Sequence, residues 1–202
     1  LDIPSSVTEI GNYAFYGSSN IESLTYNTDA IGDKFKNHKS LKTVHIGNNV
    51  TNIADWAFSN CSKLEEVTFT ASVKTVGSNA FASCTNLRKV EFANIESLCG
   101  INFDQYESNP LENAHHLYVD GEEVTRFAIP SSVSSIGSRV FSGCTNIDSI
   151  FIPATVTTIG AKAFAGCDTL TIYCDVESKP DGWNETWNPN NRPVVWKTIK
   201  QW

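Results

Sequence analysis

The chain has 202 residues, of which 41% are hydrophobic and 18% are charged, a balance typical of a folded globular protein and not of a disordered chain. Its formal net charge of -7 argues against a nucleic-acid backbone as a general partner, and no apolar run reaches the length of a membrane-spanning helix. Because the chain starts at Leu1 inside a repeated phrase and contains no methionine, we expect a piece of a longer protein, with any signal peptide outside it.

A repeated phrase organises the sequence. It reads "IPSSVTEIGNYAF" at residues 3–15 and returns as "IPSSVSSIGSRVF" at residues 129–141. The final phenylalanine recurs at a fixed spacing, for example at Phe58 and Phe81, which predicts a solenoid of stacked coils. In chain order we expect repeat units at 2–24, 25–44, 45–67, 68–90, 91–127, 128–150 and 151–173, with a tail at 174–202.

Each unit contains two short apolar patterns. The first, "L-x-x-V-x-F" as in Leu64, Val67 and Phe69, alternates at its end like a β-strand. The second, "V-x-x-I" as in Val156 and Ile159, is β-branched and favours an extended backbone. One short helical turn fits between the glycine of the phrase and the next strand. We therefore predict a mostly β solenoid whose parallel strands lie about 4.8 Å apart and bury one continuous core.

Four of the six cysteines share one repeat position, three residues after the phenylalanine. They are Cys61, Cys84, Cys144 and Cys167. Side chains stacked in such a ladder do not aim their Cβ atoms at one another, so we predict reduced core thiols here. Cys99 and Cys174 lie outside the ladder, and the sequence leaves open whether either of them forms a disulfide bond with a neighbour. Without a C-x-x-C motif or a paired Cys/His set, we expect no metal and no cofactor.

Two stretches depart from the repeat. In the 37-residue unit at 91–127, Asp120–Gly121 is a hairpin signal, and we expect an additional hairpin that projects from the solenoid. We expect the tail at 174–202 to form a cap with a strand at 192–199, because the end of a solenoid exposes its core and unpaired strand edges. The tail tryptophans that would cover the last coil are Trp183, Trp187, Trp196 and Trp202.

These units resemble the leucine-rich repeats of the BspA-like (Treponema pallidum-type) family. The resemblance rests on "IPSSVTEIGNYAF", "NIADWAFSNCSKLEEV", "VGSNAFASCTNLRKV" and "IPATVTTIGAKAFAGC", and it covers residues 2–173. It implies a curved, right-handed solenoid that lies on a bacterial surface or outside the cell. It also implies a role in adhesion, through binding to host or matrix proteins.

In repeat proteins the non-repeated positions on one face carry recognition. The outward strand positions give our candidate protein-binding face, which comprises Lys42, His45, Glu65, Thr68, Arg88, Glu91, Arg126 and Phe151. Along one column, Glu22, Lys42, Glu65 and Arg88 alternate in sign; we favour a register-fixing ladder of ion pairs over a charged binding face. Phe151 is the candidate for an exposed interface anchor, although single exposed apolar residues are common.

The sequence offers two further candidate sites, one in the tail and one at a histidine pair. Trp183 and Trp187 are either packing residues of the cap, which we favour, or an aromatic platform for carbohydrate. The pair His115–His116 lacks metal-ligand spacing, and no nucleophile or phosphate-loop motif is present, so we predict no enzymatic activity.

The sequence therefore predicts a non-catalytic module for protein–protein recognition or adhesion in a bacterial surface or secreted protein. We expect a protein ligand on the strand face, no nucleic acid and no membrane insertion of this segment. The alternatives are a carbohydrate-binding module that acts through the tail and a structural spacer for another domain.

Overall fold

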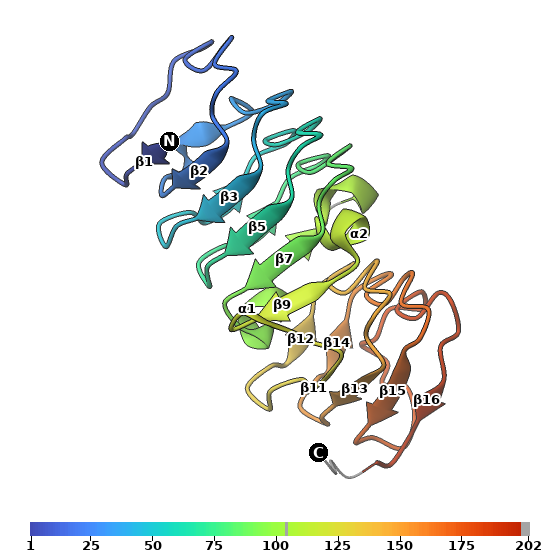
Figure 1. Cartoon of the computed structure of the whole chain (residues 1–202). Helices are drawn as coiled ribbons and strands as arrows, with labels where there is room; N and C mark the ends of the chain where they lie inside the picture. The colour runs from blue at the N-terminus through green and yellow to red at the C-terminus, as the bar shows by residue number, and fades with distance from the viewer. Residues whose placement is uncertain (104, 199–202) are drawn as a thin grey trace.

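The computed structural model describes residues 1–103 and 105–198, and these form a solenoid of coils that stack along one axis (Figure 1). Each coil contributes a strand to a sheet on one side of the stack and returns through turns on the other sides. The predicted repeat solenoid, built mostly of short strands, is confirmed.

The first strands of the coils form the two larger sheets of the described chain. Their bounds are β1 (Asp2–Ile3), β2 (Ser23–Tyr26), β3 (Thr43–Ile46), β5 (Glu66–Phe69), β7 (Lys89–Phe92), β9 (Leu117–Val119), β10 (Glu122–Glu123), β11 (Arg126–Ala128), β13 (Ser149–Ile152), β15 (Thr171–Cys174) and β16 (Val194–Val195). The seven-stranded sheet has the order β1-β2-β3-β5-β7-β9-β10, and the four-stranded sheet has the order β11-β13-β15-β16. All neighbours are parallel except β9 and β10.

Later in the coil a second, two-residue strand forms where the "V-x-x-I" pattern predicts it. Four of these strands are β4 (Asn52–Ile53), β6 (Thr75–Val76), β12 (Ser135–Ile136) and β14 (Thr158–Ile159); a fifth, β8 (Asn102–Phe103), lies in the long unit, where the pattern is not present. The pattern fails in the first coil, where residues 7–10 form no strand. The second coil has a 3-10 helix instead, η1 (Asp29–Ile31), whose first turn is capped by the side chain of Thr28.

A column of stacked phenylalanine rings fills the interior. Phe35, Phe58 and Phe81 succeed one another with ring centroids 6.4 and 5.4 Å apart. Phe141 and Phe164 stack in the same way at 5.6 Å. All five side chains are fully buried, and each such burial contributes about 1.5–3 kcal/mol to stability. A single coil cannot bury its own phenylalanine ring, so each coil is stabilised by its contact with the neighbouring coils.

The segment before the phenylalanine is a hydrogen-bonded turn, and in later coils it packs tightly on the preceding coil. A Cβ atom added to Gly160 would lie 2.4 Å from the amide nitrogen of Ser138, so the close approach of the two backbones requires glycine. Two residues before the phenylalanine, Tyr13 and Trp56 adopt left-handed φ angles of 63° and 62°, which bulky residues rarely do. The same holds for Asn79, Arg139 and Lys162.

Each of the six cysteines, all of which lie in the described part of the chain, is buried and free. In the ladder, the thiol donates a hydrogen bond to the carbonyl oxygen of the phenylalanine one coil earlier, as Cys61 does to Phe35 at 3.1 Å. The same bond joins Cys84 to Phe58 and Cys167 to Phe141. The predicted reduced core thiols are confirmed, and Cys99 and Cys174 are also unbonded.

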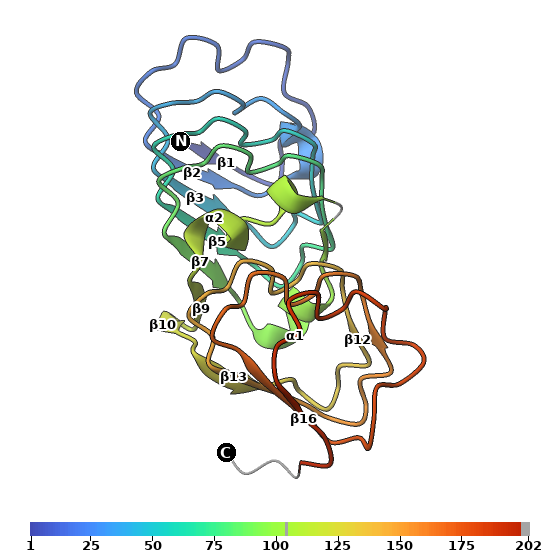
Figure 2. The ribbon, with the colours of Figure 1, turned by 90° about the vertical axis from the view of Figure 1, so that its right-hand side faces the viewer.

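The long unit at 91–127 contains elements that the sequence pattern did not predict. These are the helices α1 (Ile95–Cys99) and α2 (Leu111–Ala114) and the 3-10 helix η2 (Tyr106–Ser108). The hairpin at Asp120–Gly121 is present, formed by β9 and β10. Its first arm does not project, because β9 pairs in parallel with β7 and continues the sheet; β10 lies at the outer edge (Figure 2).

The two larger sheets share no strand pairing, so other contacts hold the halves of the solenoid together. The amide of Gly137 donates to the carbonyl of Cys99 at 3.0 Å. The side-chain amide of Asn109 donates to the carbonyls of Arg139 and Val140 at 2.7 and 3.2 Å. We call this boundary the seam.

The C-terminal tail covers the last coil. β16 pairs in parallel with β15, and Trp183 forms a bridge with Ile159. The predicted boundary between residues 173 and 174 falls inside β15. Residues 199–202 lie outside the described chain, so the end of the predicted strand at 192–199 and Trp202 do too.

Candidate functional site

The strand-face candidates form two rows on the seven-stranded sheet. His45, Thr68 and Glu91 are partners in register on β3, β5 and β7, so they make one row across the sheet. A second row immediately precedes the same strands and consists of Lys42, Glu65 and Arg88. Arg126 is the first residue of β11 and lies on the other sheet, beyond the seam.

Ion pairs join neighbouring coils within the second row. The Lys42 ammonium lies 2.9 Å from the Glu22 carboxylate, and the Arg88 guanidinium lies 2.5 Å from that of Glu65. The hydrogen bond from Lys42 lowers the pKa of Glu22, and the same bond raises the pKa of Lys42. The predicted column of alternating charges thus forms two separate ion pairs, Glu22 with Lys42 and Glu65 with Arg88. These exposed pairs neutralise one another and add little stability.

The far end of this sheet carries a denser cluster that the sequence did not indicate. Lys89 lies 2.6 Å from Glu66 and 3.1 Å from Glu91, and hydrogen bonds to both raise the pKa of the lysine. Its ammonium also lies 5.4 Å from the ring centroid of Tyr118. Tyr118 is the register partner of Glu91, so it extends the row of His45 by an aromatic side chain.

Phe151 is not an exposed anchor, which corrects the expectation. Its side chain is only 5% exposed. It lies on β13 between Ala128 of β11 and Tyr173 of β15, and all four residues of β13 are buried. The strand alternation placed Phe151 on the outer face, but the neighbouring strands shield it from solvent.

Trp183 and Trp187 do not form a carbohydrate platform, because they are 1% and 6% exposed. Their rings pack edge to face at 4.8 Å, and Trp187 contacts the ring of Phe164 at 5.7 Å. The indole nitrogen of Trp183 donates to the carbonyl of Val156 at 3.0 Å. Packing of the cap, the interpretation that we favoured, is confirmed, since buried rings cannot stack on a sugar.

The histidine pair splits between two sites. His115 Nδ1 lies 3.0 Å from the carbonyl oxygen of Gly143, whereas His116 Nδ1 lies 2.6 Å from the Glu123 carboxylate. Within residues 1–103 and 105–198 no group of three or more His, Cys, Asp or Glu side chains could hold a metal ion.

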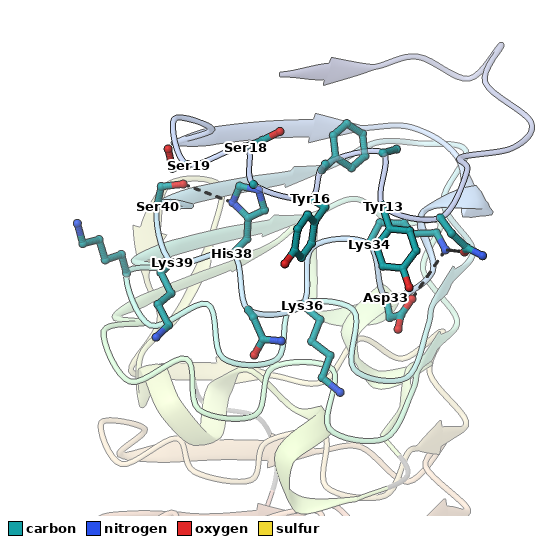
Figure 3. Close-up of a pocket in the computed structure, with 16 residues that line it drawn as sticks. Tyr13, Tyr16, Ser18, Ser19, Asp33, Lys34, Lys36, His38, Lys39 and Ser40 are labelled. Atoms are coloured by element: carbon teal, nitrogen blue, oxygen red, sulfur yellow. Dashed lines mark hydrogen bonds and ion pairs between the residues drawn. The ribbon is translucent and has the colours of Figure 1, made fainter.

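A hollow of about 870 Å³ lies on the turns of the first two coils (Figure 3). Tyr13 and Tyr16 line it with 82% and 85% of their surface exposed, and their rings meet at 5.9 Å and 86°. Lysines 34, 36, 39 and 63 lie around it, with Asp33 as the acidic neighbour. The sequence analysis did not identify this region. Aromatic residues at variable repeat positions, as in "GNYAFYG", could have indicated it.

Most of the chain matches a known family of repeat proteins. The model described as "BspA type Leucine rich repeat region" matches residues 1–110 and 115–179 in six copies. The chain belongs to the BspA-type leucine-rich repeat family. Membership in this repeat family indicates a protein-interaction module. No curated protein matches the chain. The described helices include none that is long and apolar enough to cross a membrane.

Solved structures similar to this BspA-type chain come from several bacteria. The T. pallidum leucine-rich repeat protein is 23% identical, with a TM-score of 0.41 over 65% of this chain and 57% of its own. A leucine-rich cell surface protein of Faecalibacterium prausnitzii is 19% identical, with a TM-score of 0.32 over 90% of this chain and 69% of its own. The pneumococcal vaccine antigen PcpA is 18% identical, with a TM-score of 0.35 over 90% and 60%. The chain thus spans little more than half the length of the T. pallidum protein.

Proposed function

We propose that this chain is a non-catalytic recognition module of a bacterial surface or secreted protein, and that it binds a protein ligand through the face of its seven-stranded sheet. The observation that carries the proposal is the continuous row of His45, Thr68, Glu91 and Tyr118, which stand in register on four adjacent strands. Strands fix these side chains on a rigid support, which lowers the entropy lost when a partner binds.

The centre of the proposed face lies near Tyr118. Lys89 is held there by Glu66 and Glu91 and stands beside the tyrosine ring. Tyrosine is enriched among the residues that dominate binding energy at protein interfaces. The ion pairs of Lys42 and Arg88 form a rim without net charge. Such a rim helps to align neighbouring strands, but it does not attract a protein partner over a long range.

The test uses surface plasmon resonance of the full chain against purified extracellular-matrix and serum proteins. We expect saturable binding of at least one of them. Thr68→Arg places a long charged side chain in the middle of the row, and we expect it to weaken binding by about tenfold or more. Thr157→Arg, an exposed position outside both sheets, is the matched control and is expected to bind like the original chain.

Equal binding by the Thr68→Arg variant would remove the strand face as the site. A complete lack of binding to any protein would instead favour the structural spacer.

A further inference from the structure

A second candidate surface lies on the turns, away from the sheet face. It runs over three consecutive coils: Tyr13 and Tyr16 belong to the first, Lys34 and Lys36 to the second, and Trp56 to the third. We call these five residues the turn-edge patch. The Lys36 ammonium lies 4.4 Å from the centroid of the Trp56 ring, which links the second coil to the third.

The aromatic position that Tyr13 and Trp56 share stays exposed inside the stack. Trp56 occupies the repeat position of Tyr13, yet it has coils on both sides and is still 41% exposed. Both residues have left-handed backbones, a conformation that asparagine at the equivalent Asn79 tolerates more easily. The turn itself therefore does not require a large aromatic side chain at this position.

The charge of this surface opposes that of the chain. Around the hollow, four lysines outnumber the acidic side chain of Asp33, whereas the whole chain has a net charge of -7. Lys34 is also fixed in place, because its ammonium donates to the side chain of Asn12 at 2.9 Å. A locally positive surface on an acidic protein concentrates anionic groups at that one place.

We propose that the turn-edge patch binds a linear acidic polysaccharide, one whose sugars carry carboxylate or sulfate groups. One face of a sugar ring is lined with C–H groups, which pack on the electron-rich face of an aromatic ring. Successive coils rise by about 4.8 Å, so Tyr13 and Trp56 are separated by about 10 Å along the stack. A polymer that follows the stack meets an aromatic ring, then two ammonium groups, then another ring.

The observations favour a polysaccharide over other anionic polymers. A single-stranded nucleic acid also stacks on aromatic rings, but the rings of Tyr13 and Tyr16 meet edge to face at 86°, so they do not form a platform on which successive bases stack. An acidic peptide would pair with the lysines but has no regular series of C–H-lined faces to pack on the aromatic rings. This site is separate from the sheet face, so it stands or falls independently of the proposed function.

Isothermal titration calorimetry with three hexasaccharides tests the proposal. An oligogalacturonate supplies carboxylates, a heparin fragment supplies sulfates, and maltohexaose is neutral. We expect at least one acidic hexasaccharide to bind about tenfold more tightly than maltohexaose, and to lose affinity as salt is raised. The acidic probe that binds better identifies the anionic group.

Variants at exposed positions locate the site without disturbing the fold. We expect Tyr16→Ala and Lys36→Glu each to weaken binding by about tenfold, and Tyr16→Phe to retain it because the ring remains. Lys74→Glu makes the same change of charge at an exposed position next to β6 and is expected to bind normally. Circular dichroism confirms that each variant is folded.

Three results would overturn the proposal: no binding of either acidic hexasaccharide, equal binding by Tyr16→Ala and Lys36→Glu, or tighter binding of an acidic peptide or single-stranded DNA of matched charge.

Discussion

The thiol of Cys84 donates a hydrogen bond to the carbonyl oxygen of Phe58, one coil earlier, over 3.3 Å. Burial raises the pKa of this thiol, and it raises that of Cys61 in the coil before to about 12. The ladder thiols therefore stay protonated at neutral pH and serve as donors between coils. A protonated, buried thiol reacts slowly, because the thiolate is the nucleophile.

Thiol titration tests this arrangement. Under native conditions we expect negligible reaction of the chain with a disulfide reagent such as Ellman's reagent, and all six thiols to react after unfolding in guanidinium. The midpoint of thermal unfolding should also be the same with and without a reductant. Two thiols missing from the unfolded count would show that a pair is bonded.

Gly160→Ala should destabilise the solenoid. The added methyl group would lie 2.4 Å from the amide nitrogen and 2.7 Å from the Cα atom of Ser138, so backbone has to move. Overpacking of this kind costs about 1–3 kcal/mol of unfolding free energy, measurable by urea denaturation. Gly11→Ala is the matched control, because its methyl group would meet no atom within 4 Å. Equal stability of both variants would refute the close-contact explanation.

The stability of the chain should depend on pH through Glu112. Its carboxyl is buried at the seam, with one oxygen accepting from the Ser142 hydroxyl at 2.6 Å and the other unpartnered. Burial raises its pKa from 4.5 to about 7, more than the Ser142 hydrogen bond and the nearby Arg139 lower it. The folded state thus keeps this proton at a pH where the unfolded state has lost it.

The sign of the effect follows from this difference. The stability that the proton provides is fully present below pH 4.5 and is lost as the pH rises to about 7. The loss amounts to at most about 3 kcal/mol. Urea titrations between pH 4 and 8 measure it. Glu112→Gln imitates the protonated carboxyl, so its contribution should not vary with pH, and the variant should be the more stable one at pH 8. A parallel pH profile for both chains would contradict the assignment.

Trp183→Ala should be among the more damaging single changes. The side chain is 1% exposed and its indole nitrogen is bonded to the carbonyl of Val156. Loss of such a buried ring costs about 3–5 kcal/mol. Trp56→Ala removes the same side chain at an exposed position and should cost far less. Differential scanning calorimetry compares the two; similar melting temperatures would mean that the cap does not hold the last coil.

The repeated positions made the fold predictable from sequence. Residues such as Phe58 and Cys84 have equivalents in other coils, and each equivalent position meets the same neighbours, so one pattern describes many contacts. Phe151 was misjudged because its exposure depends on Ala128 and Tyr173, side chains that vary from coil to coil. The alternation pattern of one strand predicts on which face of the sheet a side chain lies. It does not predict whether side chains of the neighbouring strands cover that side chain.

The non-repeated parts were predictable only in outline. A cap was expected on general grounds, yet the bridge of Trp183 to Ile159 needed coordinates. The helices α1 and α2 had local signals, namely Asn94 as an N-cap and Pro110 ahead of Leu111, which the repeat pattern concealed. Tyr13 and Tyr16 stand beside Phe15 in the sequence, and only the coil geometry shows that two of these three rings face solvent.

The seam gives the solenoid a mechanical character. Elsewhere each coil is fastened to the next by a strand ladder, which must break several backbone hydrogen bonds together. At the seam the neighbouring halves are joined by separate hydrogen bonds, such as those of Gly137 to Cys99, of Asn109 to Arg139 and of Ser142 to Glu112, and by core packing. Tension along the stack would therefore open the chain there first, so that a protein anchored at one end and attached at the other could lengthen under load while its coils stay folded.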